Sequence, residues 1–281
     1  MQVIPRQRLL LLFALLSTGA QAQWLNYPTP GIPRMPNGKP NLTAPVPRAP
    51  DRKPDLSGVW SHDQTPLPEM QRLFGANVGL GNVPGMEIET VSKYALNLFA
   101  DFKPDEAPIR PKAMEILRQR KQTDFPPTHC LPTGIPFGAL VSEPIKIVQT
   151  ARLTVIMFEG DDPRQIYTDG RELPKEFDQP AWLGYSVGKW DQDSFVVETA
   201  GFNDKSWLDG IGHPHSEALR ITERYHRRDF GHMDVEMTFN DPEMYTKPFT
   251  IKVPYHLLAD SDIFEYICNE NEKDLAHMRQ K

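Results

Sequence analysis

The feature that most constrains the fold is a change in hydrophobic periodicity near residue 140. Beyond it, short segments rich in β-branched and aromatic residues alternate apolar with polar side chains, a pattern typical of half-buried strands. One example places Leu219, Ile221 and Tyr225 on one face and Arg224 and His226 on the other. Segments that predict strands cover 55–60, 145–150, 153–159, 164–170, 184–190, 194–202, 218–228, 232–241, 249–257 and 262–268.

No long helical pattern separates these segments, so their regular spacing predicts an antiparallel meander. Asp169-Gly170 favours a tight hairpin turn after the segment at 164–170. A meander of this length removes its edges by closing into a barrel or curling into a sandwich. We therefore predict a mainly β fold, an antiparallel lipocalin-like barrel, with a β-sandwich as the alternative.

The residues before the meander have other patterns. Basic residues, the apolar run "LLLLFALL" and "AQA" at 20–22 predict a secretory signal peptide over 1–22 and hence a secreted or periplasmic protein. Residues 23–54 form a proline-rich arm, in which "PNGKPNLT" and "PDRKPDLS" repeat a pattern. We expect one domain over 55–281, with two or three short helices inserted at about 64–121 and a short helix after residue 268.

Charge and cysteine content limit the partners. The chain of 281 residues has a formal charge of −6, which argues against nucleic-acid binding because that needs a basic surface. No segment after the leader has the length of a membrane span, so we expect no membrane insertion. The two cysteines, Cys130 and Cys268, favour a disulfide in an oxidising compartment over a cysteine nucleophile. The oligomeric state stays open.

Gly58-Val59-Trp60 resembles the Gly-x-Trp signature of lipocalins and related calycin barrels. The resemblance implies that the tryptophan closes the barrel base against a later arginine, Arg224 or Arg227. More broadly, "KPDLSGVW", "IYTDGRELP", "GYSVGKWDQDSFVVETAGFND" and "GHPHSEALRITERY" resemble a group of uncharacterised secreted bacterial proteins. This second resemblance implies secretion and a β-rich fold, and it carries no catalytic assignment.

The densest polar cluster lies on a glycine-rich loop that leads into a strand. A histidine with a neighbouring carboxylate performs proton transfer, and an arginine stabilises a developing negative charge. We therefore expect a lyase, isomerase or hydrolase that acts on a small organic substrate at the barrel mouth. The candidate catalytic residues are His213, His215, Asp209, Glu217 and Arg224. The candidate substrate-binding residues are His62, Asp204, Trp207 and Arg171.

Two alternatives use the same residues differently. His213 and His215 are candidate ligands of a divalent transition metal such as zinc, with a carboxylate completing the site. Otherwise no cofactor is expected, since no nucleotide-binding motif occurs. The functional alternative is a non-catalytic, lipocalin-like small-molecule binding protein, for which we expect a deep apolar cavity with the histidines outside it. A plain structural role for these turn residues also stays open.

Overall fold

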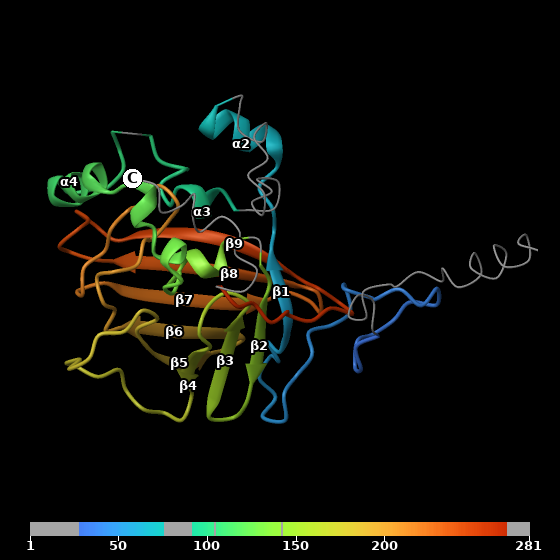
Figure 1. Cartoon of the computed structure of the whole chain (residues 1–281). Coiled ribbons are helices and arrows are strands. Elements are labelled where there is room, and N and C mark those ends of the chain that lie inside the picture. Colours follow the sequence, from blue (N-terminus) through green and yellow to red (C-terminus); the bar gives the residue numbers. More distant parts are fainter. Residues whose placement is uncertain (1–27, 76–91, 104, 142, 269–281) are drawn as a thin grey trace, which may run out of the picture.

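The computed structural model describes residues 28–75, 92–103, 105–141 and 143–268. In these residues nine strands close into one barrel, where each strand pairs with its neighbours in chain order and β1 pairs with β9 (Figure 1). The predicted lipocalin-like barrel is confirmed, and the sheet does not divide into a sandwich. The strands are β1 (Gly58–His62), β2 (Ile145–Gln149), β3 (Leu153–Phe158), β4 (Arg164–Tyr167), β5 (Tyr185–Asp191), β6 (Ser194–Ala200), β7 (Arg220–Arg227), β8 (His232–Asn240) and β9 (Phe249–Leu257).

One pairing departs from the predicted meander. β4 and β5 pair in parallel, with Ile166 opposite Ser186, whereas every other neighbouring pair is antiparallel. The hairpin turn predicted at Asp169-Gly170 is therefore wrong, because parallel strands need a connection that returns the chain to the starting end. The segment 168–184 makes this return.

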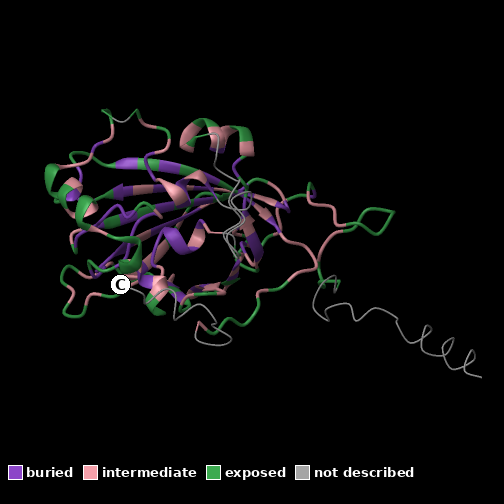
Figure 2. Ribbon diagram, turned by 45° about the horizontal axis from the view of Figure 1, so that its top comes forward, coloured by how far each residue is buried: buried purple, intermediate pink, exposed green. Residues whose placement is uncertain are grey.

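Alternating side chains fill the barrel interior. Every second residue of β7 is buried, and burial also alternates along β8 and β9 (Figure 2 colours the ribbon by burial). In β8 and β9 the inward positions carry apolar side chains that belong to one continuous core. Trp60, Phe239 and Tyr255 are among its largest fully buried members. The interior of the barrel is thus a packed core, and a ligand site has to be sought beside it.

A polar network is buried within this core. The Arg164 guanidinium forms two hydrogen bonds with the Glu223 carboxylate, which also accepts one from the Tyr225 hydroxyl at 2.7 Å. Arg164 further donates to the hydroxyls of Ser186 and Thr199. Because the charges are paired and hydrogen-bonded, they are compatible with burial.

The segment between β1 and β2 covers one end of the barrel. Its described helices are α2 (Leu67–Phe74), α3 (Lys93–Leu96) and α4 (Pro111–Gln119), with 3₁₀ turns η2 (Gln122–Asp124), η3 (Pro126–His129) and η4 (Phe137–Ala139). Proline lies in the first turn of α4, where no amide donor is needed. The Phe99 ring contacts the Phe249 ring in a tilted arrangement, with centroids 4.6 Å apart, and Tyr255 donates to the Ala139 carbonyl at 2.6 Å. The predicted helical insertion therefore closes this mouth with its own side chains.

The arm packs on the body from residue 28 onward. Its repeated sequences form two similar turns, bridged between Arg34 and Pro40 and between Arg48 and Pro54. Each arginine also forms a bidentate ion pair. Arg34 pairs with Asp260, and Arg48 pairs with Asp193. The two repeated sequences thus form similar turns, and each turn attaches the arm to the body through an ion pair.

At the opposite end of the barrel, Arg227 contacts Trp60 of the Gly58-Val59-Trp60 sequence. The Arg227 guanidinium lies over the Trp60 ring, 4.8 Å from its centroid. It also donates to the backbone carbonyls of Asp55, Asp229 and Phe230. Of the two arginines proposed for this contact, the partner is Arg227.

The end of the described chain differs from its prediction. Residues 262–268 form no strand, because β9 already pairs with β1 and no free edge remains. Instead Cys268 forms the predicted disulfide with Cys130. The predicted signal peptide and final helix lie outside the described residues. No helix among the described residues is long and apolar enough to cross a membrane.

Candidate functional site

The loop between β6 and β7 is built around the buried carboxylate of Asp209. This carboxylate accepts hydrogen bonds from the backbone amides of Leu98, Gly212 and His213 and from the His213 ring, whose Nδ1 lies 2.5 Å from Oδ2. Gly212 has a φ of 101°, which favours glycine at this turn. Asp209 and His213 therefore join the loop to the segment after α3, and the carboxylate has no accepting position left open toward solvent.

His215 is buried on the other side of Pro214. Its Nε2 lies 2.7 Å from the Ser206 hydroxyl, and its Nδ1 lies 3.2 Å from the Ser216 carbonyl. The carbonyl requires a proton on Nδ1, so Nε2 accepts from Ser206. Burial lowers the pKa of His215, which favours this neutral form.

A small polar cleft brings three predicted residues together. Asp204, His215 and Glu217 line a space of about 400 Å³ beside α4. The Arg120 guanidinium also lines it, donates to the Gly212 carbonyl at 2.8 Å and lies over the Trp207 ring. Burial lowers the pKa of Arg120. Trp207 itself is buried beneath the cleft.

Three predicted residues lie elsewhere. Arg224 is on the outer face of β7 and pairs with Asp191 at 2.9 Å. Arg171 follows β4, where it pairs with Asp169 and covers the Tyr167 ring. His62 is buried at the end of β1, with Nε2 2.8 Å from the Val141 carbonyl. The structure therefore does not assemble the full predicted set around one opening.

The described residues offer no third ligand for a metal ion bound by His213 and His215. They contain no group of three histidine, cysteine, aspartate or glutamate side chains placed to hold a metal ion. In addition, Nδ1 of His213 already contacts Asp209, and both ring nitrogens of His215 have protein partners.

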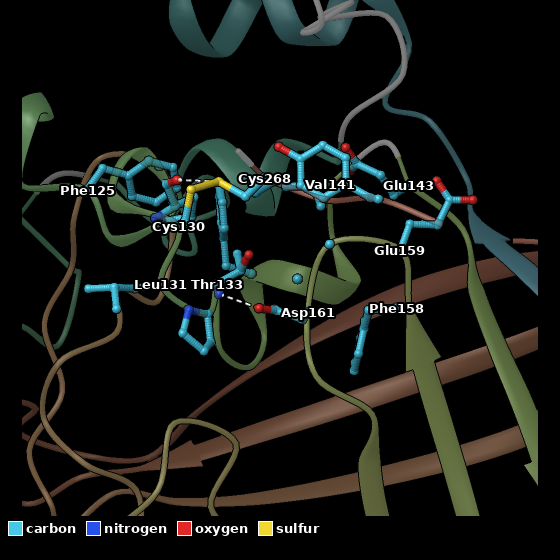
Figure 3. Close-up of a pocket in the computed structure, with 18 of the residues that line it drawn as sticks. Phe125, Cys130, Leu131, Thr133, Val141, Glu143, Phe158, Glu159, Asp161 and Cys268 are labelled. Atoms are coloured by element: carbon cyan, nitrogen blue, oxygen red, sulfur yellow. Dashed lines mark hydrogen bonds between the residues drawn. A yellow bond between two sulfur atoms is a disulfide. The ribbon is translucent and has the colours of Figure 1, made fainter. Parts of the chain in front are cut away.

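A much larger cavity lies beside the helical insertion, and we call it the main cavity. Its volume is about 1090 Å³, and the disulfide forms part of its wall (Figure 3). Segments from α2 to residue 268 contribute to it, and neither His213 nor His215 is among the described lining residues. The apolar lining side chains include Phe74, Phe125, Leu131, Phe137, Val141, Phe158, Ile211 and Tyr266.

Two half-buried carboxylates from the loop after β3 face this cavity. Asp161 Oδ1 accepts from the Thr133 amide at 2.6 Å, as Figure 3 shows, whereas its buried Oδ2 has no hydrogen-bond partner among the described residues. Burial raises the pKa of Asp161 to about 6. Glu159 accepts from the Phe264 amide at 2.9 Å, and burial, with the nearby charge of Glu143, raises its pKa.

Sequence reasoning missed the main cavity. Its lining residues are distant in sequence and follow no pattern that indicates a binding site. One indication was available only after folding: the large apolar side chains of Leu131, Ile211 and Tyr266 line the cavity yet are 46%, 47% and 61% exposed. Exposed apolar side chains gathered around a hollow are typical of binding surfaces.

The comparisons with known proteins add no assignment. No family model, no curated protein and no solved structure matches this chain.

Proposed function

We propose that the protein binds a small, largely apolar molecule in the main cavity. The observation that carries the proposal is a hollow of about 1090 Å³ with aromatic and aliphatic walls. Its volume is of the size that small-molecule sites occupy, and such sites combine apolar walls with a few polar groups. Here the half-buried Asp161 and Glu159 are polar groups of that kind.

The arrangement favours binding over proton transfer by the loop histidines. His213 and His215 are 4% and 2% exposed, and their contacts tie together segments of the protein. A general base must reach the proton that it removes, directly or through one water molecule. The apolar cavity lies beside the packed barrel, and neither histidine is among its described lining residues, which supports a binding role without these histidines.

Acid–base catalysis in the polar cleft is the second candidate function. It is favoured by the position of His215, which lines one space together with Asp204 and Glu217. A His215→Ala variant that keeps an activity found in a substrate screen would remove this candidate.

Secretion to an oxidising compartment is part of the proposal. The Cys130–Cys268 disulfide supports it, because such bonds form and persist outside the reducing cytosol. Mass spectrometry of the mature chain from a secreting host tests it. Cleavage near residue 22 is the expected result, and an intact N-terminus contradicts it.

Binding can be tested with N-phenyl-1-naphthylamine, a neutral apolar probe whose fluorescence rises in apolar surroundings. We expect Leu131→Arg and Ile211→Arg to weaken probe binding about tenfold or more, because each places a long charged side chain at the cavity wall. Val148→Arg is the matched control, since Val148 is 40% exposed on β2 and does not line the cavity. Equal binding by all three variants and the wild type refutes the proposal.

A further inference from the structure

The charged side chains in the described lining of the main cavity all have one sign. Four acidic residues line it, two at the wall (Glu159 and Asp161) and two that are exposed (Glu143 and Asp162). Its described lining contains no lysine, arginine or histidine. Elsewhere on the barrel, acidic side chains are often paired, as Asp191 is with Arg224. The cavity wall is therefore negative as well as apolar.

In the described part of the chain, no cationic side chain pairs with these carboxylates. Among the described residues none of the four forms an ion pair. The two wall carboxylates contact neutral donors: Asp161 accepts from the Thr133 amide, and Glu159 accepts from the Phe264 amide. A half-buried carboxylate without a counter-charge loses hydration without an ionic partner to offset the loss. The raised pKa values of Asp161 and Glu159 report this deficit.

The position of Asp161 adds a specific polar atom. Oδ2 rests against Gly138, so closely that a Cβ on that glycine would lie 2.8 Å away. The carboxyl group is held in this place by the Thr133 amide on its other oxygen. Oδ2 is thus a buried acceptor beside the cavity that has no hydrogen-bond donor among the described residues.

We propose that the ligand of the main cavity is an organic cation, an apolar molecule that carries a protonated amine. This inference rests on the proposed binding function. The ammonium group pairs with the carboxylates of Glu159 and Asp161, while the remainder of the molecule contacts the aromatic wall. Phenylalanine and tyrosine rings attract cations on their faces, so Phe158 and Tyr266 suit the same ligand. A fatty acid or other anion is disfavoured, because it adds a like charge to an acidic wall.

The test compares molecules of one shape and different charge. Binding of 1-naphthylmethylamine, 1-naphthylmethanol and 1-naphthoic acid is measured by isothermal titration calorimetry near neutral pH. We expect the amine to bind about tenfold or more tightly than the alcohol, and the acid to bind weakest. Glu159→Gln/Asp161→Asn should abolish the preference for the amine over the alcohol. Both substitutions keep an oxygen that accepts the backbone amides.

The chain offers a matched control in Glu176→Gln/Asp178→Asn. These residues have the same spacing and charge, are exposed and do not line the cavity. We expect this variant to retain the wild-type preference. Equal binding of amine and alcohol by the wild type overturns the cationic ligand and leaves the binding function standing. Loss of preference in the control variant also overturns it, because long-range charge then explains the effect. No binding of any of the three compounds or of the neutral probe overturns both proposals.

Discussion

The half-buried carboxyl group of Asp161 makes a prediction about stability that needs no ligand. Burial raises its pKa from the ordinary value of 3.8 to about 6. The folded chain therefore holds this proton up to about pH 6, whereas the unfolded chain releases it near pH 4. Unfolding free energy is consequently lost as the pH rises from about 4 to about 6. Each pKa unit corresponds to about 1.4 kcal/mol, so the loss approaches roughly 3 kcal/mol at neutral pH.

Asp161→Asn removes the ionisation and keeps an acceptor for the Thr133 amide. We expect the variant to become more stable relative to the wild type as the pH rises. From the same two pKa values, the stability difference should grow by roughly 2 kcal/mol between about pH 4.5 and about pH 7.5. Urea unfolding at the two pH values measures it, and taking the difference between the two proteins cancels the other titrating groups. Asp178→Asn, on an exposed segment, is the control.

The reasoning fails if the stability difference between Asp161→Asn and the wild type is the same at both pH values. A constant offset shows that the substitution changes packing or hydrogen bonding and that the charge of Asp161 is not destabilising. A fall of the difference with pH shows that the carboxylate is stabilised in the folded protein. Either result also removes the argument that the cavity wall lacks a counter-charge.

The fold makes three further predictions for urea unfolding. Cys130→Ser should destabilise the protein by up to about 5 kcal/mol, because the disulfide spans 138 residues; an equal loss in reduced wild type confirms the cause. Arg227→Ala should lower the free energy of unfolding by about 2–4 kcal/mol, because three backbone carbonyls lose their donor. Arg224→Ala on the outer face should lower it by less than about 1 kcal/mol. Glu223→Gln should lower the free energy of unfolding by about 3–5 kcal/mol, because it leaves Arg164 buried without its ionic partner. The double variant Glu223→Gln/Arg164→Met should recover part of this loss, and a double variant less stable than the single one contradicts the pairing.

The barrel was predictable because its strands repeat one simple pattern. In β9 (Phe249–Leu257) the predicted and observed ends agree, since alternation of apolar and polar residues continues without interruption and the apolar face has one core to enter. The pairing of β4 with β5 was not predictable in this way. Asp169-Gly170 has the chemistry of a tight turn, and only the position of β5 in the closed sheet decides that the chain returns before pairing.

The candidate site was predictable only as a concentration of polar residues. The sequence identified Asp209, His213 and His215, and the structure places all three in the loop that feeds β7. It did not indicate that their hydrogen bonds are made within the protein, because the partners, such as Ser206 and the Leu98 amide, carry no distinguishing pattern. Buried polar groups of this kind satisfy one another, so their density alone does not separate structure from chemistry.

The main cavity lies outside the packed barrel interior, among the described parts of the helical insertion, the loop after β3 and the residues near Cys268. Inside the barrel, apolar side chains and the Arg164–Glu223 pair satisfy one another and leave the space occupied. Outside it, the disulfide holds Cys268 against the segment before η4, and Asp161 has an acceptor without a donor among the described residues. A site that folding leaves apolar, acidic and incompletely satisfied is best completed by a ligand that brings both a hydrophobic surface and a positive charge. The preference for an amine over its neutral analogue is therefore the measurement that connects this architecture to a function.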